Sequence, residues 1–229
     1  MRLLDIGLHL FHCELENHDY LWFSSFEISK ISYTSEMLHN YALSYALSGF
    51  GQVLTTNLPP TYESDLAQMT HYSTPAVASN VSRTRLTGNA VSDLTLRTDD
   101  KPGNINSPDL GWRVVVDPWT SPANSFSCYV FTRTGTVPGV VRLGKKGCAM
   151  RIRSKELADA DAQLVGQSVA PTHPVNPLDV NGDLVEYRLV PMPPHLLLTD
   201  VQIQRDWFVI SGRHRVQVPR RFASQFGRH

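Results

Sequence analysis

The residues best suited to chemistry lie between Gly139 and Arg153, in the sequence GVVRLGKKGCAMRIR. Its basic residues are Arg142, Lys145, Lys146, Arg151 and Arg153, and no acidic residue interrupts them. Gly144 and Gly147 flank the lysines, and glycine lets a backbone approach a ligand and present its N–H groups. Lysine and arginine donate to phosphate. The stretch therefore predicts a cradle for a nucleic-acid backbone; the alternative is a solvated hairpin with basic tips.

The chain has 21 basic and 21 acidic residues, so its net charge is zero and favours no particular class of binding partner. Its distribution is more informative. Residues 1–66 hold eight acidic and two basic side chains, residues 142–155 hold six basic and no acidic ones, and residues 203–229 hold six arginines against Asp206. Basic segments far apart in sequence can meet as one positive face after folding.

Metal and redox chemistry have little support in the sequence. Three cysteines without a CxxC pair fit a reducing cytosol better than a disulfide scaffold. His9, His12 and Cys13 are close in sequence, but on a strand His12 faces away from the other two. We therefore expect no metal and no cofactor. The first residues, with Asp5 and two histidines, predict neither a signal peptide nor a membrane span.

The first elements that must position these residues are a hairpin and a helix. Alternating apolar residues predict a strand over residues 2–15, and residues 20–28 are expected to return as its partner. A helix is predicted from a cap at Thr34 or Ser35 to Gly49. His39 and Asn40 lie off its apolar stripe, so they either contact RNA or a neighbouring subunit, or form its solvated side.

The middle of the chain, residues 52–138, predicts short strands separated by polar loops, as in an elaborated insertion. Residues 52–70 are expected to be loop, and strands are expected within residues 71–81, 112–116 and 127–132. Arg83 and Arg85 alternate in a Thr/Ser-rich run, so a strand would project both to one face. Both are further candidates for nucleic-acid contact.

The last third predicts a short helix at 154–163, a proline-rich loop, and a strand at 184–190. Residues 204–210 and 214–218 are expected to pair as a hairpin about Ser211-Gly212-Arg213. Arg213 and Arg215 would then share one face, and they complete the set of candidates for nucleic-acid contact.

Four segments together resemble a known family. LHNYALSYALSGFG (38–51), HYSTPA (71–76), VRLGKKGCAMRI (141–152) and THPVNPLDV (172–180) are similar, in this order, to the small Cascade subunit of type I-D CRISPR systems. This subunit belongs to the RAMP superfamily, in the branch that caps the 5′ handle of the guide RNA (crRNA). The resemblance spans about residues 1–205, and the arginine-rich end is less recognisable.

The resemblance implies an α+β fold with a ferredoxin-like, RRM-related core and an inserted β-rich thumb. It thus predicts one RAMP-type domain over residues 1–229, with an insertion at about 52–138. RAMP proteins usually bind RNA through glycine-rich loops and basic strand surfaces. The positions that match are Arg142, Gly144, Lys145, Lys146 and Gly147; we add Arg151, Arg153, His39 and Asn40 as RNA-binding candidates.

The resemblance also implies assembly. Such a subunit lies at the 5′ handle of the crRNA, against the repeating backbone subunit and the large subunit, in the prokaryotic cytoplasm. Its end of the complex is expected to meet target double-stranded DNA near the PAM. Protein contacts then hold phosphate, sugar and splayed bases, while guide–target pairing reads sequence.

Two other functions remain open. Some relatives in another subtype cut precursor crRNA without a metal, and His39, Tyr41, Lys145, Lys146 and His214 are suitable residue types for such an endoribonuclease. Their spacing specifies no site, and the type I-D resemblance implies a separate processing enzyme, so we expect no catalysis. The other alternative is a protein-only scaffold subunit, which steep salt dependence of RNA binding would exclude.

Overall fold

The computed structural model describes residues 1–28, 31–49, 60–78, 81–89, 110–116, 125–144 and 147–222. The first half contains η1 (Leu3–Ile6), β1 (His9–Asn17), β2 (Phe26–Ile28), β3 (Ile31–Tyr33), β4 (Met37–Leu38), α1 (Asn40–Ser48), α3 (Tyr62–Gln68), β5 (His71–Ser73), β6 (Ala76–Ala78), β7 (Arg83–Asn89) and β8 (Leu110–Val116). The second half contains β9 (Ser125–Thr132), β10 (Val140–Leu143), β11 (Cys148–Glu156), β12 (Ala162–Val165), η2 (Pro177–Asp179), β13 (Asp183–Val190), β14 (Leu197–Gln204), β15 (Asp206–Ser211) and β16 (His214–Gln217).

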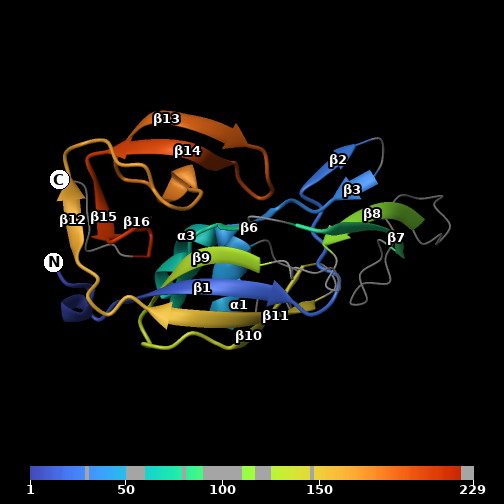
Figure 1. The fold of residues 1–229 in the computed structure, drawn as a ribbon, viewed down its shortest axis with the longest axis horizontal. Coiled ribbons are helices and arrows are strands. Elements are labelled where there is room, and N and C mark those ends of the chain that lie inside the picture. The colour runs from blue at the N-terminus through green and yellow to red at the C-terminus, as the bar shows by residue number, and fades with distance from the viewer. Residues whose placement is uncertain are drawn as a thin grey trace.

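A curled antiparallel main sheet occupies the centre of the molecule (Figure 1). Its strand order is β10-β11-β1-β9-β6-β4, and β5 also pairs with β9. β1 alternates because one face of this sheet is buried: Phe11, Cys13 and Leu15 pack with Leu43 and Leu47 of α1 in one apolar core.

A C-terminal lobe, residues 157–222, packs against one end of the sheet (Figure 1). It contains the sheet β12-β15-β16 and the hairpin β13-β14. Val216 and Val218 of this lobe share a core with Leu10 and Phe131 of the main sheet. The lobe therefore covers one end of the sheet surface that faces away from α1.

The α+β class is confirmed in broad terms, but the predicted ferredoxin-like core is not established. The α-helices of the described residues are α1 and α3. The helix expected at 154–163 is wrong, because β11 runs through residue 156 and β12 begins at Ala162. The segment continues as strand because each residue through 156 pairs with β1.

The predicted N-terminal hairpin is also wrong. Residues 3–6 form a 3-10 turn that ends at Gly7 with φ 69°, and β1 starts only at His9. β1 pairs with β9 and β11, whereas β2 pairs with β3 in a separate sheet of order β2-β3-β8-β7. Local alternation therefore identified a strand here but not its partners.

The other strand predictions are largely confirmed, including β5 and β6, β7, β8, β9, β13 and the β15–β16 hairpin. Of the strands that the structure describes within residues 52–138, β5, β6 and β9 belong to the main sheet, and β7 and β8 join the separate one. Residues 62–68, expected to be loop, form α3, where the Asp65 carboxylate accepts from the Thr61 N–H.

Candidate nucleic-acid interface

The basic stretch folds as a β hairpin, so both of its interpretations agree on the local structure. β10 pairs with β11, and Met150 and Ile152 point into the core. The alternating residues Arg151, Arg153 and Lys155 are exposed on the opposite face. Arg142 lies opposite Ala149 in the register, which places it on the same exposed face.

The neighbouring strands extend this face in rows. Across β11, β1 and β9, the first row is Lys155–His12–Tyr129, the second is Arg153–Glu14–Ser127, and the third is Arg151–Glu16–Ser125. Residues opposite one another on adjacent antiparallel strands project to the same side. We call this surface the polar sheet face; it comprises Arg142 and the nine residues of these rows.

Part of its positive charge is neutralised within the chain. Arg153 donates to both carboxylate oxygens of Glu16, at 2.8 and 3.0 Å. Arg142 donates from Nη1 to the Gly147 carbonyl, 3.0 Å away. Within the described residues, Arg151 and Lys155 make no side-chain hydrogen bond or ion pair. Among the basic residues of β10 and β11 that the structure describes, Arg151 and Lys155 are therefore the ones without such a partner.

The two basic segments that the sequence expected to form one positive face meet at His12. Burial is the main cause that lowers the pKa of this imidazole, while Glu14 raises it and the cations Arg213 and Lys155 lower it further. Arg213 lies in the β15–β16 turn and Lys155 lies on β11, yet the positive charges of both lower the pKa of the His12 ring. Arg215 is more restrained, because its Nε donates to the Ala170 carbonyl at 2.6 Å.

A groove of about 630 Å³ adjoins the polar sheet face. The main sheet contributes Met37 and Val77 to its wall, and Thr172 and His173 of the C-terminal lobe lie opposite. Thr172 is 3.0 Å from the Tyr129 hydroxyl, so one wall of the groove contacts the first row of the face. Carboxylates also line it, Glu186 among them, so its charge is mixed.

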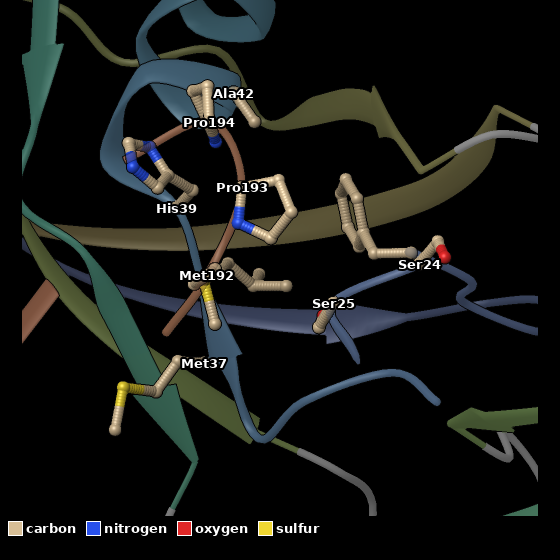
Figure 2. A pocket seen from close by; sticks show the side chains of 10 residues that line it. Ser24, Ser25, Met37, His39, Ala42, Met192, Pro193 and Pro194 are labelled. Atoms are coloured by element: carbon tan, nitrogen blue, oxygen red, sulfur yellow. The ribbon is translucent and has the colours of Figure 1, made fainter. Parts of the chain in front are cut away.

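A second hollow, of about 290 Å³, has a different character. Figure 2 shows Met37, His39, Met192 and the two prolines that follow Met192 around it. Its lining, as far as the described residues form it, contains no Lys, Arg, Asp or Glu, so these residues offer no charge to a phosphate. It suits an apolar group better than a nucleic-acid backbone.

His39 and Asn40 do not lie on a solvated helix side, which corrects one of the two interpretations given to them. α1 starts at Asn40, and His39 is its N-cap, with Nδ1 accepting from the Tyr41 N–H at 3.1 Å. Thr34 and Ser35 are not the cap, because residues 34–36 lead into β4 and α1 begins only after it. Asn40 has no exposed surface and His39 only 5 %. Neither presents the surface that RNA contact needs in this conformation.

These residues belong to a buried network centred on Asp179 of η2. Its carboxylate accepts from Asn40 Nδ2 at 2.9 Å, from the Tyr41 hydroxyl at 3.1 Å and from the Tyr72 hydroxyl at 2.7 Å. Asn176, which lies just before η2, donates from Nδ2 to Asn40 Oδ1. Three of the four family-like segments therefore meet here, and they fasten the C-terminal lobe to α1 and β5.

The glycines of the hairpin tip have a structural role. Gly144 and Gly147 adopt positive φ, 76° and 65°. A Cβ on Gly144 would lie 2.7 Å from the Trp22 carbonyl oxygen. Lys145 and Lys146 lie outside the described residues, so their predicted role in the cradle stays a prediction.

We expect Gly144→Ala to destabilise the protein by about 2 kcal/mol, because left-handed backbone and a clash with a carbonyl add up at this position. Chemical denaturation measures this. Gly139→Ala is the matched control, since a Cβ there meets nothing within 4 Å. Equal stability of the two variants would contradict the packing role of Gly144.

The remaining arginine candidates lie apart from the polar sheet face. Arg83 and Arg85 are both exposed on β7, two residues apart as predicted. Arg83 donates to the Thr34 carbonyl at 3.2 Å and lies 3.5 Å from the Glu36 carboxylate. The β7–β8 pair stands at the opposite end of the molecule from the β15–β16 hairpin (Figure 1).

Sequence reasoning missed Lys155, His12 and Tyr129 as site residues. Lys155 continues the alternation of Arg151 and Arg153, so extending that pattern by one strand position would have found it. Tyr129 carried no such signal, because its place beside His12 depends on the long-range pairing of β1 with β9.

The described residues contain no group of three side chains suited to hold a metal ion. Within the same residues, no helix has the length and apolar character needed to cross a membrane.

Comparison with known proteins agrees with the resemblance of the four segments. No curated protein matches the chain. A family profile described as type I-D CRISPR-associated protein Cas5/Csc1 matches residues 8–227, which is nearly the whole chain. The chain therefore belongs to the Cas5/Csc1 family and is a subunit of the type I-D CRISPR Cascade complex.

Proposed function

We propose that this subunit binds and caps the 5′ handle of the crRNA through the polar sheet face. The observation that carries the proposal is the meeting of Lys155 and Arg213 at His12, with Arg151 two rows away on the same face. Cations without ion-pair partners attract a phosphate backbone. The adjoining groove, with mixed charge, suits splayed handle bases, which carry both donors and acceptors.

The assembled complex supplies the other partners. Val185, Tyr187 and Leu189 alternate along β13 and are 57, 49 and 53 % exposed. Such a strip of apolar side chains supports docking against the backbone or large subunit. The exposed Arg85 on the separate β7–β8 pair supports a contact with target DNA near the PAM at that end.

We further propose that the subunit does not cut RNA. Tyr41 is almost fully buried and bonded to Asp179, whereas His214 contacts Tyr129, so the candidate catalytic residues that the structure describes do not form one cluster.

RNA binding is tested by replacing the two free cations of β11. For Arg151→Ala with Lys155→Ala, we expect weaker binding of a handle RNA and a slope of log affinity against log salt that is shallower by about 0.7 per lost phosphate contact. The matched control is Arg205→Ala, which removes an exposed arginine paired with Asp183 in the C-terminal lobe. Identical salt slopes for the two proteins would overturn the proposed interface.

Catalysis is tested by incubating the protein with repeat RNA in EDTA. We expect no product. Product that disappears in His214→Ala would show that the subunit is an endoribonuclease and would overturn this part of the proposal.

A further inference from the structure

Three aromatic side chains form a cluster at the end of the polar sheet face, beside the C-terminal lobe. They are His12 of β1, Tyr129 of β9 and His214 of β16. Their ring centroids are 5.3 Å apart for His12–Tyr129, 5.4 Å for His12–His214 and 5.5 Å for Tyr129–His214. Both histidines are half-buried at the surface. Three strands that are distant in sequence therefore bring two imidazoles and a phenol to one place.

Each imidazole uses one nitrogen within the protein. His12 Nε2 is 2.9 Å from Ser127 Oγ, and His214 Nδ1 is 2.7 Å from the Tyr129 hydroxyl. His12 Nδ1 and His214 Nε2 make no hydrogen bond to the described residues. One nitrogen on each ring is thus left for a ligand, and the other fixes the ring orientation.

The surroundings of the cluster favour an anion. Burial is the largest cause that lowers the pKa of both imidazoles; His12 lowers the pKa of His214 next, and the charges of Arg213 and Lys155 lower the pKa of both rings. Burial raises the pKa of Tyr129, and the charges of Arg213 and Arg215 lower it. Within the described residues, Lys155 and Arg213 have no ion-pair partner.

One carboxylate opposes these cations. Glu14 raises the pKa of His12, but burial and the two cations outweigh it. On the side of the groove, the ring of His173 lies 5.7 Å from Tyr129, and burial lowers the pKa of His173 to about 4, so it stays neutral. The charges around the two imidazoles therefore disfavour protonation as long as no anion is bound.

We propose that His12, Tyr129 and His214, with Lys155 and Arg213 beside them, form a binding site for one phosphodiester group of an RNA strand, which takes up a proton when it is filled. This proposal rests on the proposed function, because the ligand of the site is RNA. A phosphate beside the imidazoles favours their charged form, so its binding raises their pKa. By linkage, affinity must then rise as the pH falls through the range in which the rings titrate.

The first test measures affinity for a short single-stranded RNA carrying the handle at constant salt, at about pH 7.5 and about pH 6. We expect wild-type affinity to rise toward low pH, by up to about tenfold per pH unit for each proton taken up. His12→Gln with His214→Gln should lose most of this rise. His18→Gln is the matched control, because His18 is an exposed histidine just beyond the end of β1.

The outcomes separate the two proposals. An equal rise in wild type and double variant overturns the phosphate site and leaves handle binding intact. Absence of RNA binding by wild type at both pH values overturns the proposed function instead.

The second test needs no variant, so it holds even if the double variant does not fold. Histidine ring resonances of the wild-type protein are titrated by NMR with and without inorganic phosphate, and again with the RNA. We expect the pKa of His12 and of His214 to rise with each ligand. Unchanged pKa values of both His12 and His214 would overturn the site, whether or not RNA binds elsewhere.

Discussion

Asp179→Ala is expected to lower the free energy of unfolding by roughly 3 kcal/mol, because several buried neutral donors lose their shared acceptor. The carboxylate has no exposed surface and accepts three hydrogen bonds, from Asn40, Tyr41 and Tyr72. Its removal leaves these donors buried without an acceptor, and each such donor costs about 1–3 kcal/mol, not additively. Urea unfolding followed by circular dichroism measures the change.

Asp159→Ala is the matched control, because Asp159 is an exposed aspartate in the same C-terminal half. It should change stability by less than about 0.5 kcal/mol. If Asp179→Ala is no more destabilising than this control, the network does not hold the C-terminal lobe to α1.

Acidification is expected to destabilise the protein through His173, by about 3 kcal/mol between pH 6.5 and pH 4. Burial lowers the pKa of this ring from its ordinary value of 6.5 to about 4. The Nδ1 atom of this ring donates to the Pro174 carbonyl, and its Nε2 atom accepts from the Gln217 N–H at 3.2 Å. A proton on Nε2 would therefore break the hydrogen bond from Gln217. A depressed folded pKa gives stability that is present above pH 6.5 and lost as the pH falls toward 4.

Denaturation midpoints at several pH values measure this loss. His173→Gln should remove about half of the acid-dependent loss, because burial also lowers the pKa of His39 to about 4 and that contribution stays. His18→Gln should leave the loss unchanged, since His18 is exposed. A wild-type protein that is equally stable at both pH values would contradict the buried neutral state of His173.

The elements with strong local patterns were predictable from the sequence. The β15–β16 hairpin follows from alternation on both sides of Ser211-Gly212-Arg213, and its bounds agree with the structure to within two residues. The exposure of Arg151 and Arg153 follows in the same way from period two on β11. Gly49 ends α1 as predicted, because it adopts positive φ, 61°.

Elements whose conformation depends on distant partners were not predictable. Residues 154–156 have a helix-compatible sequence, but pairing with β1 holds them in a strand. The position of Asn40 off the apolar stripe was compatible with a solvated helix side, yet Asn40 is buried, because Asp179 supplies its hydrogen-bond partner. A buried polar group is stable only with such partners, and a local pattern does not contain them.

The sequence by itself determined the family, the basic strand surface and most strand positions, because these depend on residue types at short spacing. The tertiary structure alone decided that Lys155 and Arg213 act on one imidazole, and that Glu16 neutralises Arg153. It also brought three family-like segments to Asp179. The physical reason is that charge pairing and burial depend on distance in space, which long-range strand pairing sets.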